Sequence, residues 1–135
     1  MELVVGQETT REMTVTEETV RAYAELTGDR NPLHFDAGFV AGTRFRRLIA
    51  QGGIATGLLH ALVAMDMPGP GSVFLSQDWS FPRPVYIGET IRAVATVASV
   101  QNRRGIAKLR FEVKNQDGDV VLKGEATVMQ VQPGT

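Results

Sequence analysis

The sequence contains no cysteine and few histidines. The absence of cysteine excludes thiol nucleophiles, disulfide bonds and thiolate metal sites, and nothing in the chain requires an oxidising compartment. Only two histidines occur among the 135 residues. Because histidine is the side chain that most readily exchanges a proton near neutral pH, proton transfer by imidazole has to use His34 or His60.

The sequence also lacks an excess of one charge and a long hydrophobic run. The 14 basic and 15 acidic residues give a net charge of -1, and no basic stripe with interleaved aromatic residues occurs, so no nucleic-acid partner is expected. The longest apolar run, from Ile54 to Met67, contains His60 and Asp66 and is too short to cross a membrane. Residues 1–10 show no signal-peptide pattern, so we expect a cytoplasmic protein.

The length of 135 residues fits one domain with one core, which we predict over residues 1–135. In the first half, Thr16 precedes two acidic residues, apolar residues follow at helical spacing, and Gly28 stands where a helix would end. A loop from Asp29 to His34 follows, and Asp36 can cap a further short turn.

The segment that begins with Gln51, Gly52 and Gly53 predicts a central helix that reaches Met65. Apolar residues occupy nearly every side of this helix, which is typical of a helix that is buried all round. In a chain of this length, a sheet wrapped around the helix is the simplest way to bury it.

Strands are predicted both before and after these helices in the sequence. A short strand at about Thr9–Val15 comes first, and four more follow the central helix: Val73–Phe81, Thr90–Val100, Ala107–Val113 and Val120–Val131. Within Val73–Phe81, the odd-numbered residues are predicted to share one face and the even-numbered residues the other. Asp117-Gly118 predicts the hairpin turn before the last strand.

The predicted fold is therefore α+β: an antiparallel sheet wrapped around a buried helix, the layout called a hot-dog fold. Long strands at the edges of such a sheet leave backbone groups unpaired. We accordingly expect a homodimer or a higher homo-oligomer in which two sheets join edge to edge.

Asp29 and His34 are the strongest candidates for chemistry. They lie five positions apart, and Pro32 between them stiffens the loop, so a proton-transfer pair is the leading interpretation. The structural alternatives are a turn aspartate that bonds its own backbone and a loop histidine that caps a backbone carbonyl. A metal site built from Asp29, His34 and Asp36 has no further histidine or cysteine nearby, so no metal is expected.

The glycines at residues 52 and 53 open the central helix, where free backbone N–H groups attract negative charge and glycine lets a ligand approach. The alternative is that they only permit close packing against the sheet. His60, in the middle of this helix, is interpreted as a core histidine or as a residue that lines the binding site.

Three stretches resemble the family of (R)-specific enoyl-CoA hydratases and MaoC-like dehydratases. Residues 27–36, TGDRNPLHFD, are similar to the hydratase motif of that family. Residues 49–54, IAQGGI, resemble the start of its central helix, and residues 80–89, SFPRPVYIGE, resemble the strand and turn that follow. The likeness runs from Val4 to Val131 and agrees with the hot-dog layout.

The resemblance implies a function and a site. The reaction is the reversible syn hydration of a trans-2-enoyl-CoA to the (R)-3-hydroxyacyl-CoA, with the CoA thioester as substrate and no cofactor. Asp29 and His34 match the pair that activates one water, and Gly52 matches the residue whose backbone N–H receives the thioester oxygen. Asn31, Gln51, Gly53 and His60 are the residues expected at the substrate.

Two positions depart from the family. Gln51 stands where many members have histidine, and Gly53 stands where they have a bulky apolar residue. The lost volume at Gly53, together with the polar His60, suggests a short or functionalised acyl group. Arginines are candidates for the CoA phosphates, although the sequence does not say which of them lie near the site: Arg44, Arg46, Arg47, Arg83 and Arg103.

Two alternatives stay open at this point. A thioesterase on the same fold would need an acidic residue on the central helix near the oxyanion donor, and Asp66 stands far along that helix. A catalytically silent acyl-CoA-binding protein or partner subunit is the other alternative, and such a protein would need neither Asp29 nor His34.

Overall fold

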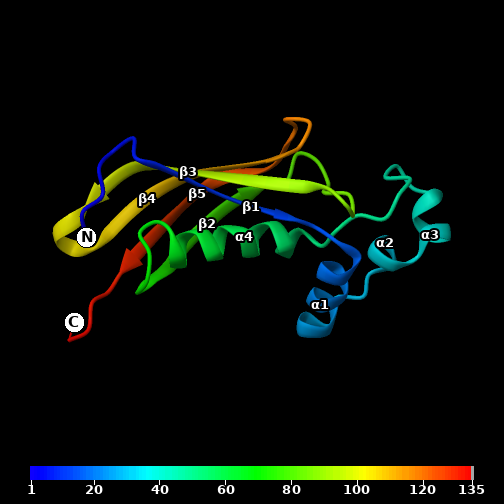
Figure 1. Cartoon of the computed structure of the whole chain (residues 1–135), viewed down its shortest axis with the longest axis horizontal. Coiled ribbons are helices and arrows are strands. Elements are labelled where there is room, and N and C mark those ends of the chain that lie inside the picture. The colour runs from blue at the N-terminus through cyan, green and yellow to red at the C-terminus, as the bar shows by residue number, and fades with distance from the viewer. Residues whose placement is uncertain (135) are drawn as a thin grey trace.

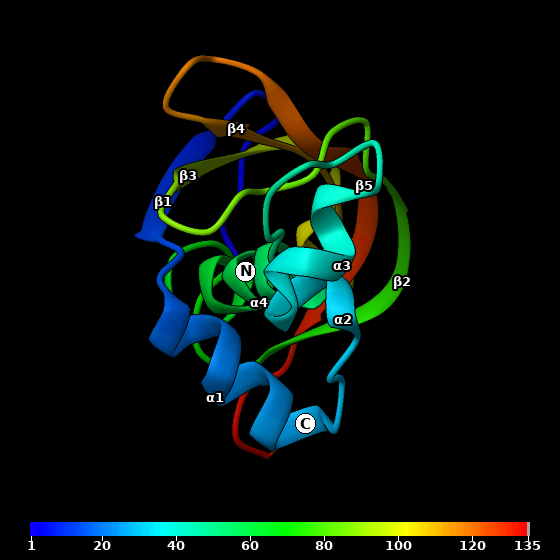
Figure 2. The same ribbon diagram turned by 90° about the vertical axis from the view of Figure 1, so that its right-hand side faces the viewer.

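The computed structural model describes residues 1–134 and shows a curved sheet that wraps around one long helix, α4 (Figures 1 and 2). The five strands are β1 (Glu8–Thr14), β2 (Ser72–Ser80), β3 (Thr90–Gln101), β4 (Ile106–Asn115) and β5 (Val120–Gln130). The helices are α1 (Glu17–Thr27), α2 (Pro32–Phe35), α3 (Ala37–Ala41), α4 (Gly52–Met65) and the 3-10 turn η1 (Asn102–Arg104). The predicted hot-dog fold is confirmed.

The strands lie in the order β1-β3-β4-β5-β2, and every neighbouring pair is antiparallel. The consecutive strands β3, β4 and β5 form hairpins, and the predicted turn at Gly118 is confirmed with a positive φ of 83°. The chain crosses from β1, at one edge of the sheet, through the helices to β2, at the opposite edge. Consequently β1 and β2 have unpaired edges in the isolated chain.

Helix α1 begins and ends where the sequence predicts. The Thr16 side chain accepts a hydrogen bond from the backbone N–H of Thr19, and the Thr19 side chain accepts one from the backbone N–H of Thr16, which forms a capping box. Gly28 ends the helix in the left-handed conformation with φ 83°, which glycine adopts without steric cost. Both ends are set by local chemistry.

The segment after α1 differs from the predicted loop. Pro32 occupies the first turn of the short helix α2, which Asn31 caps through its side chain, so that His34 lies on a helical turn and not in a loop. Asp36 caps α3 by accepting from the backbone N–H of Phe39 at 2.9 Å, as predicted. The proline therefore starts a helix here as well as stiffening the chain.

Helix α4 is the centre of the core, but the prediction that it is buried on every side is wrong for the single chain. Its buried residues are Ile54, Ala55, Leu58, Leu59, Leu62 and Val63, and they pack against the inner face of the sheet. Gly52, Gly57, His60 and Met65 are exposed. The sheet covers one side of the helix and leaves the opposite side open.

Strand β2 also departs from the predicted alternation. A register shift between Phe74 and Ser76 is a β-bulge, which moves Phe74 to the face occupied by Trp79. Phe74 and Trp79 both pack on Phe111, with ring centroids 6.3 and 5.3 Å away. Val73 and Leu75 are half exposed as a result.

No helix in the described part of the chain is long and apolar enough to span a membrane.

Candidate active site

The predicted pair lies where α1 gives way to α2. The Nε2 atom of His34 is 3.9 Å from Oδ1 of Asp29, which is too far for a direct hydrogen bond. The His34 side chain is only 7% exposed, whereas the Asp29 side chain is 42% exposed. A buried imidazole thus faces a carboxylate that solvent can reach. One water molecule could bridge Nε2 of His34 and Oδ1 of Asp29 at this distance.

The backbone fixes the other nitrogen of His34. Nδ1 lies 2.6 Å from the carbonyl oxygen of Ile49, and because a carbonyl oxygen only accepts, Nδ1 carries the proton. In neutral imidazole the lone pair is then on Nε2, the atom nearest Asp29. His34 therefore does cap a backbone carbonyl, and this contact leaves Nε2 free to accept a proton.

Short polar contacts hold Asp29 in its turn. Its backbone N–H donates to Oγ1 of Thr27 at 3.2 Å, and its Oδ1 accepts from the backbone N–H of Asn31 at 3.3 Å. The Asn31 side chain in turn accepts from the backbone N–H of Leu33 at 3.1 Å. Oδ2 of Asp29 makes no hydrogen bond within residues 1–134, so one carboxylate oxygen is available for a water or substrate.

The start of α4 is open. Gln51 is its N-cap residue but makes no capping bond with its side chain, so the side chain of Gln51 does not accept from the backbone N–H groups of Gly52 and Gly53. The Gln51 side chain, in a residue that is 2% exposed, instead donates from Nε2 to the carbonyl oxygen of Val20 at 3.1 Å. This bond ties α1 to the residue that precedes Gly52.

The expectation of free volume at Gly53 is wrong. The hydroxyl of Tyr23 occupies the place where a Cβ at residue 53 would stand. Tyr23 is on α1, one turn after Val20, so both contacts of α1 with the start of α4 come from one face of that helix. Helical spacing predicts that shared face, but no sequence signal points it at Gly53. The suggestion of a short acyl group loses this support.

His60 is exposed on the open side of α4, so the interpretation as a core histidine is wrong. Trp79 donates from Nε1 to Oε1 of Gln77 at 3.2 Å, and Nε2 of Gln77 lies 3.1 Å from Nε2 of His60. Because the amide nitrogen is a donor, the imidazole nitrogen accepts. A role for His60 in lining the binding site stays a prediction.

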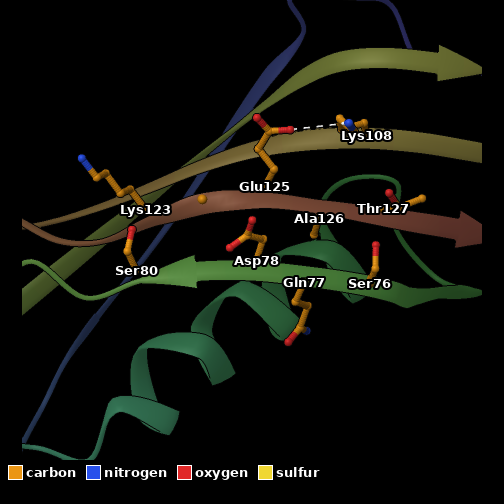
Figure 3. A pocket seen from close by; sticks show the side chains of 10 residues that line it. Ser76, Gln77, Asp78, Ser80, Lys108, Lys123, Glu125, Ala126 and Thr127 are labelled. Carbon is orange, nitrogen blue, oxygen red and sulfur yellow. Dashed lines mark ion pairs between the residues drawn. The ribbon is translucent and has the colours of Figure 1, made fainter.

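A hollow of about 530 Å³ lies across β2, β5 and β4, on the face of the sheet away from α4 (Figure 3). Its charged residues are Asp78, Lys108, Lys123 and Glu125, and Lys108 and Glu125 form an ion pair at 3.7 Å. Gln77 points away from these side chains, toward α4. No predicted catalytic residue lines this hollow, so it is not the candidate site.

A second cavity, of about 280 Å³, lies beside the start of α4. Ile49, Gln51 and Gly52 are in its lining, together with Phe81, whose ring lies 3.3 Å from the position of a Cβ at residue 52. Neither Asp29 nor His34 lines this cavity, and His34 instead lines a separate cavity of about 210 Å³. The hydrogen bond from the His34 ring to Ile49 joins the proton-transfer pair to the segment that lines the cavity beside Gly52. No pattern in the sequence predicts that Phe81 lies at this place.

The metal interpretation finds no support in the geometry. Among residues 1–134, no group of three or more histidine, aspartate or glutamate side chains is arranged to hold a metal ion. Asp36, the third residue of that interpretation, caps α3.

Comparisons with known proteins show the family of this chain. A family model described as MaoC like domain matches residues 4–118. The chain is 36% identical to the (R)-specific enoyl-CoA hydratase of Aeromonas caviae, over 93% of this chain and 94% of that protein. It is 38% identical to the 3-hydroxybutyryl-CoA dehydratase of Methylorubrum extorquens, over 94% of this chain and 80% of that protein. The solved (R)-hydratase from A. caviae involved in PHA biosynthesis superposes with a TM-score of 0.90, at 35% identity, over 96% of this chain and 98% of that one.

Proposed function

This chain belongs to the MaoC-like family and is a hydro-lyase, and we propose that it adds water reversibly to a trans-2-enoyl-CoA to give the (R)-3-hydroxyacyl-CoA. The observation that carries the proposal is the distance of 3.9 Å between Asp29 and Nε2 of His34, whose Nδ1 is bonded to Ile49 just before the open start of α4. The substrate assignment draws on the names of the similar enzymes.

The water is held by two acceptors in this proposal. It donates one hydrogen to Nε2 of His34 and the other to the Asp29 carboxylate, which leaves its oxygen lone pairs free to attack Cβ of the substrate. As the new C–O bond forms, one O–H bond breaks and its proton passes to the pair. The same pair, on the same face, then gives a proton to Cα, so hydrogen and hydroxyl add syn.

Gly52 is the third residue of the proposed catalytic site, after Asp29 and His34. When oxygen adds to Cβ, the electrons of the double bond move toward the thioester carbonyl, and negative charge develops on its oxygen. The backbone N–H of Gly52 at the positive end of α4 donates to that oxygen in this proposal. The thioester itself accepts the electrons, so we propose that the reaction needs no cofactor.

A thioesterase on this fold has weaker support. Asp66 is the acidic residue at the C-terminal end of α4, and Arg11 holds its carboxylate with two hydrogen bonds of 3.0 and 3.2 Å. Gly52 is the first of the 14 residues of α4 and Asp66 directly follows the last, so at 1.5 Å per residue they are roughly 20 Å apart. Asp66 therefore lies at the wrong end of the helix to act at the thioester.

Crotonyl-CoA tests the reaction. We expect the purified protein to remove the conjugated enoyl absorbance without releasing thiol. Release of free thiol would support the thioesterase. Binding of crotonyl-CoA with neither signal would support a silent acyl-CoA-binding protein or partner subunit, and either result contradicts the proposed hydration.

We also propose that the chain forms a homodimer through the edge of β2. This edge has unpaired backbone groups, and three large apolar side chains beside it are half exposed: Val73 at 48%, Leu75 at 51% and Phe81 at 51%. Most buried hydrophobic residues within 1–134 form one cluster that reaches from Leu3 to Val128, which supports the proposal that residues 1–135 form one domain in each subunit. A cytoplasmic location stays a prediction.

Mass measurement in solution checks the dimer. We expect twice the chain mass of 14.7 kDa at micromolar concentration, and a shift toward the monomer for Leu75→Lys, because a charge would be buried at the joined edges. Leu26→Lys is the matched control, since Leu26 is 83% exposed on α1. A wild-type protein that stays at 14.7 kDa would rule out the dimer.

A further inference from the structure

We propose that the cavity beside Gly52 receives the pantetheine arm of the substrate and that Arg44 and Arg83 at its rim bind the phosphate groups of CoA. This inference rests on the proposed hydration, because it requires the thioester to lie at Gly52. It selects two of the five arginines that the sequence offers as phosphate ligands.

The cavity has the composition that such an arm requires. Among the described residues that line its volume of about 280 Å³, Arg44 and Arg83 are the only charged ones. The walls are largely apolar and include Phe45, Phe81 and two prolines. Gly52 lies in the same lining. A single cavity thus connects the proposed oxyanion donor to two guanidinium groups through an apolar passage that suits a chain of methylene and amide groups.

Neither arginine is neutralised by the protein. Within residues 1–134, no carboxylate lies within ion-pair distance of Arg44 or Arg83, whereas Arg11 and Lys108 each have an acidic partner. The Arg44 guanidinium lies over the Phe45 ring, whose centroid is 5.5 Å away. Two unpaired guanidinium groups at one cavity favour an anion, and the guanidinium fork matches phosphate geometry.

The two arginines come from segments far apart in the sequence that hydrogen bonds hold together. Arg44 follows α3, and Arg83 lies between β2 and β3. The hydroxyl of Tyr86 donates to the carbonyl oxygen of Phe45 at 2.9 Å, and the backbone N–H of Ala50 donates to the carbonyl oxygen of Val85 at 2.7 Å. The rim is therefore built before any ligand arrives.

The other arginines are placed differently. Arg47 lies over the ring of Tyr86 at 4.0 Å and is not in the cavity lining. Arg46 is also outside the lining, and Arg103 belongs to η1, at the turn between β3 and β4. Because Arg103 keeps the same charge away from the cavity, it provides a matched control.

Substrates with and without the nucleotide test the inference. Kinetics with crotonyl-CoA and with crotonyl-pantetheine, which lacks the nucleotide and its phosphates, are compared for wild type, Arg44→Ala, Arg83→Ala, the double variant and Arg103→Ala. The loss of a charge-assisted hydrogen bond typically weakens the binding affinity about ten- to a hundredfold. We expect the double variant to lose about that factor in kcat/KM for crotonyl-CoA, through KM, while its kcat/KM for crotonyl-pantetheine stays at the wild-type value.

The results separate the two proposals. Equal losses on both substrates, or no loss on crotonyl-CoA, would overturn the phosphate site while leaving the hydratase proposal intact. A wild-type protein that hydrates neither substrate would contradict the hydratase proposal. In that event, calorimetric binding of CoA and of pantetheine still tests the arginines: preference for CoA that is lost in the double variant and kept in Arg103→Ala supports the site, and an unchanged preference overturns it.

Discussion

Asp29→Asn and His34→Asn are each expected to lower the rate of crotonyl-CoA hydration by about 10²- to 10⁴-fold, the range typical of a lost general acid or base. The reason is that the water needs both acceptors: Nε2 of His34 and the Asp29 carboxylate, 3.9 Å apart. Asparagine at residue 29 keeps an Oδ1 acceptor for the Asn31 backbone but removes the carboxylate charge. The loss should fall mainly on kcat.

The choice of asparagine at residue 34 protects the fold. Its amide can donate to the Ile49 carbonyl from about the place of Nδ1, while nothing replaces Nε2. His34→Ala should be equally inactive but would also leave that buried carbonyl without its donor, at a cost of about 1–3 kcal/mol. Thermal unfolding separates the two effects, and Asp117→Asn in the exposed β4–β5 turn is the control. Near-normal turnover by either asparagine variant would contradict the assignment of the pair.

Gly52→Pro is expected to lower kcat by about 10²- to 10³-fold, the usual effect of removing one oxyanion donor. Proline lacks the backbone N–H, and residue 52 is the first residue of α4, a position where helices accept proline. Gln51 has φ -64° and ψ 137°, the extended conformation that a residue before proline adopts. The variant therefore deletes the proposed donor without breaking the helix.

Gly52→Ala is the matched control for this experiment. It adds the same Cβ, 3.3 Å from the Phe81 ring, but keeps the N–H donor. Phe81 is 51% exposed, so its ring can move by the small distance required. We expect the alanine variant to lose far less activity than the proline variant when both have wild-type circular dichroism. Equal losses would show that the side-chain contact matters and not the N–H group, and would exclude Gly52 as the donor.

The elements of the fold were predictable because their signals are local. Thr16 and Gly28 cap α1 through bonds that span only a few residues, and the period of two in β4 gives one buried and one exposed face. Where a local pattern was broken, prediction failed. The bulge after Phe74 brings Phe74 onto the face of Trp79, where it packs on Phe111, more than 30 residues away in the sequence. A pattern within β2 alone does not predict that contact.

In the candidate site too, local features were predictable from the sequence and contacts between distant residues were not. Asp29, Pro32 and His34 are close in sequence, so their pairing could be inferred from a short motif. The carbonyl that fixes the His34 proton belongs to Ile49, and the hydroxyl that fills the space at Gly53 belongs to Tyr23. Neither partner carries a sequence signal, because any residue has a backbone carbonyl and an aromatic residue on a helix is usually read as core.

The sequence by itself determined most of the secondary structure and the hot-dog layout, because caps and periodicity act over short distances along the chain. A motif of ten residues was also enough to predict the acid–base pair. Only the tertiary structure decided which nitrogen of His34 is free, how α1 packs on the start of α4, which side of α4 stays open and which two arginines share a cavity with Gly52. These features depend on contacts between residues distant in sequence, which the order of the strands and the path of the backbone create.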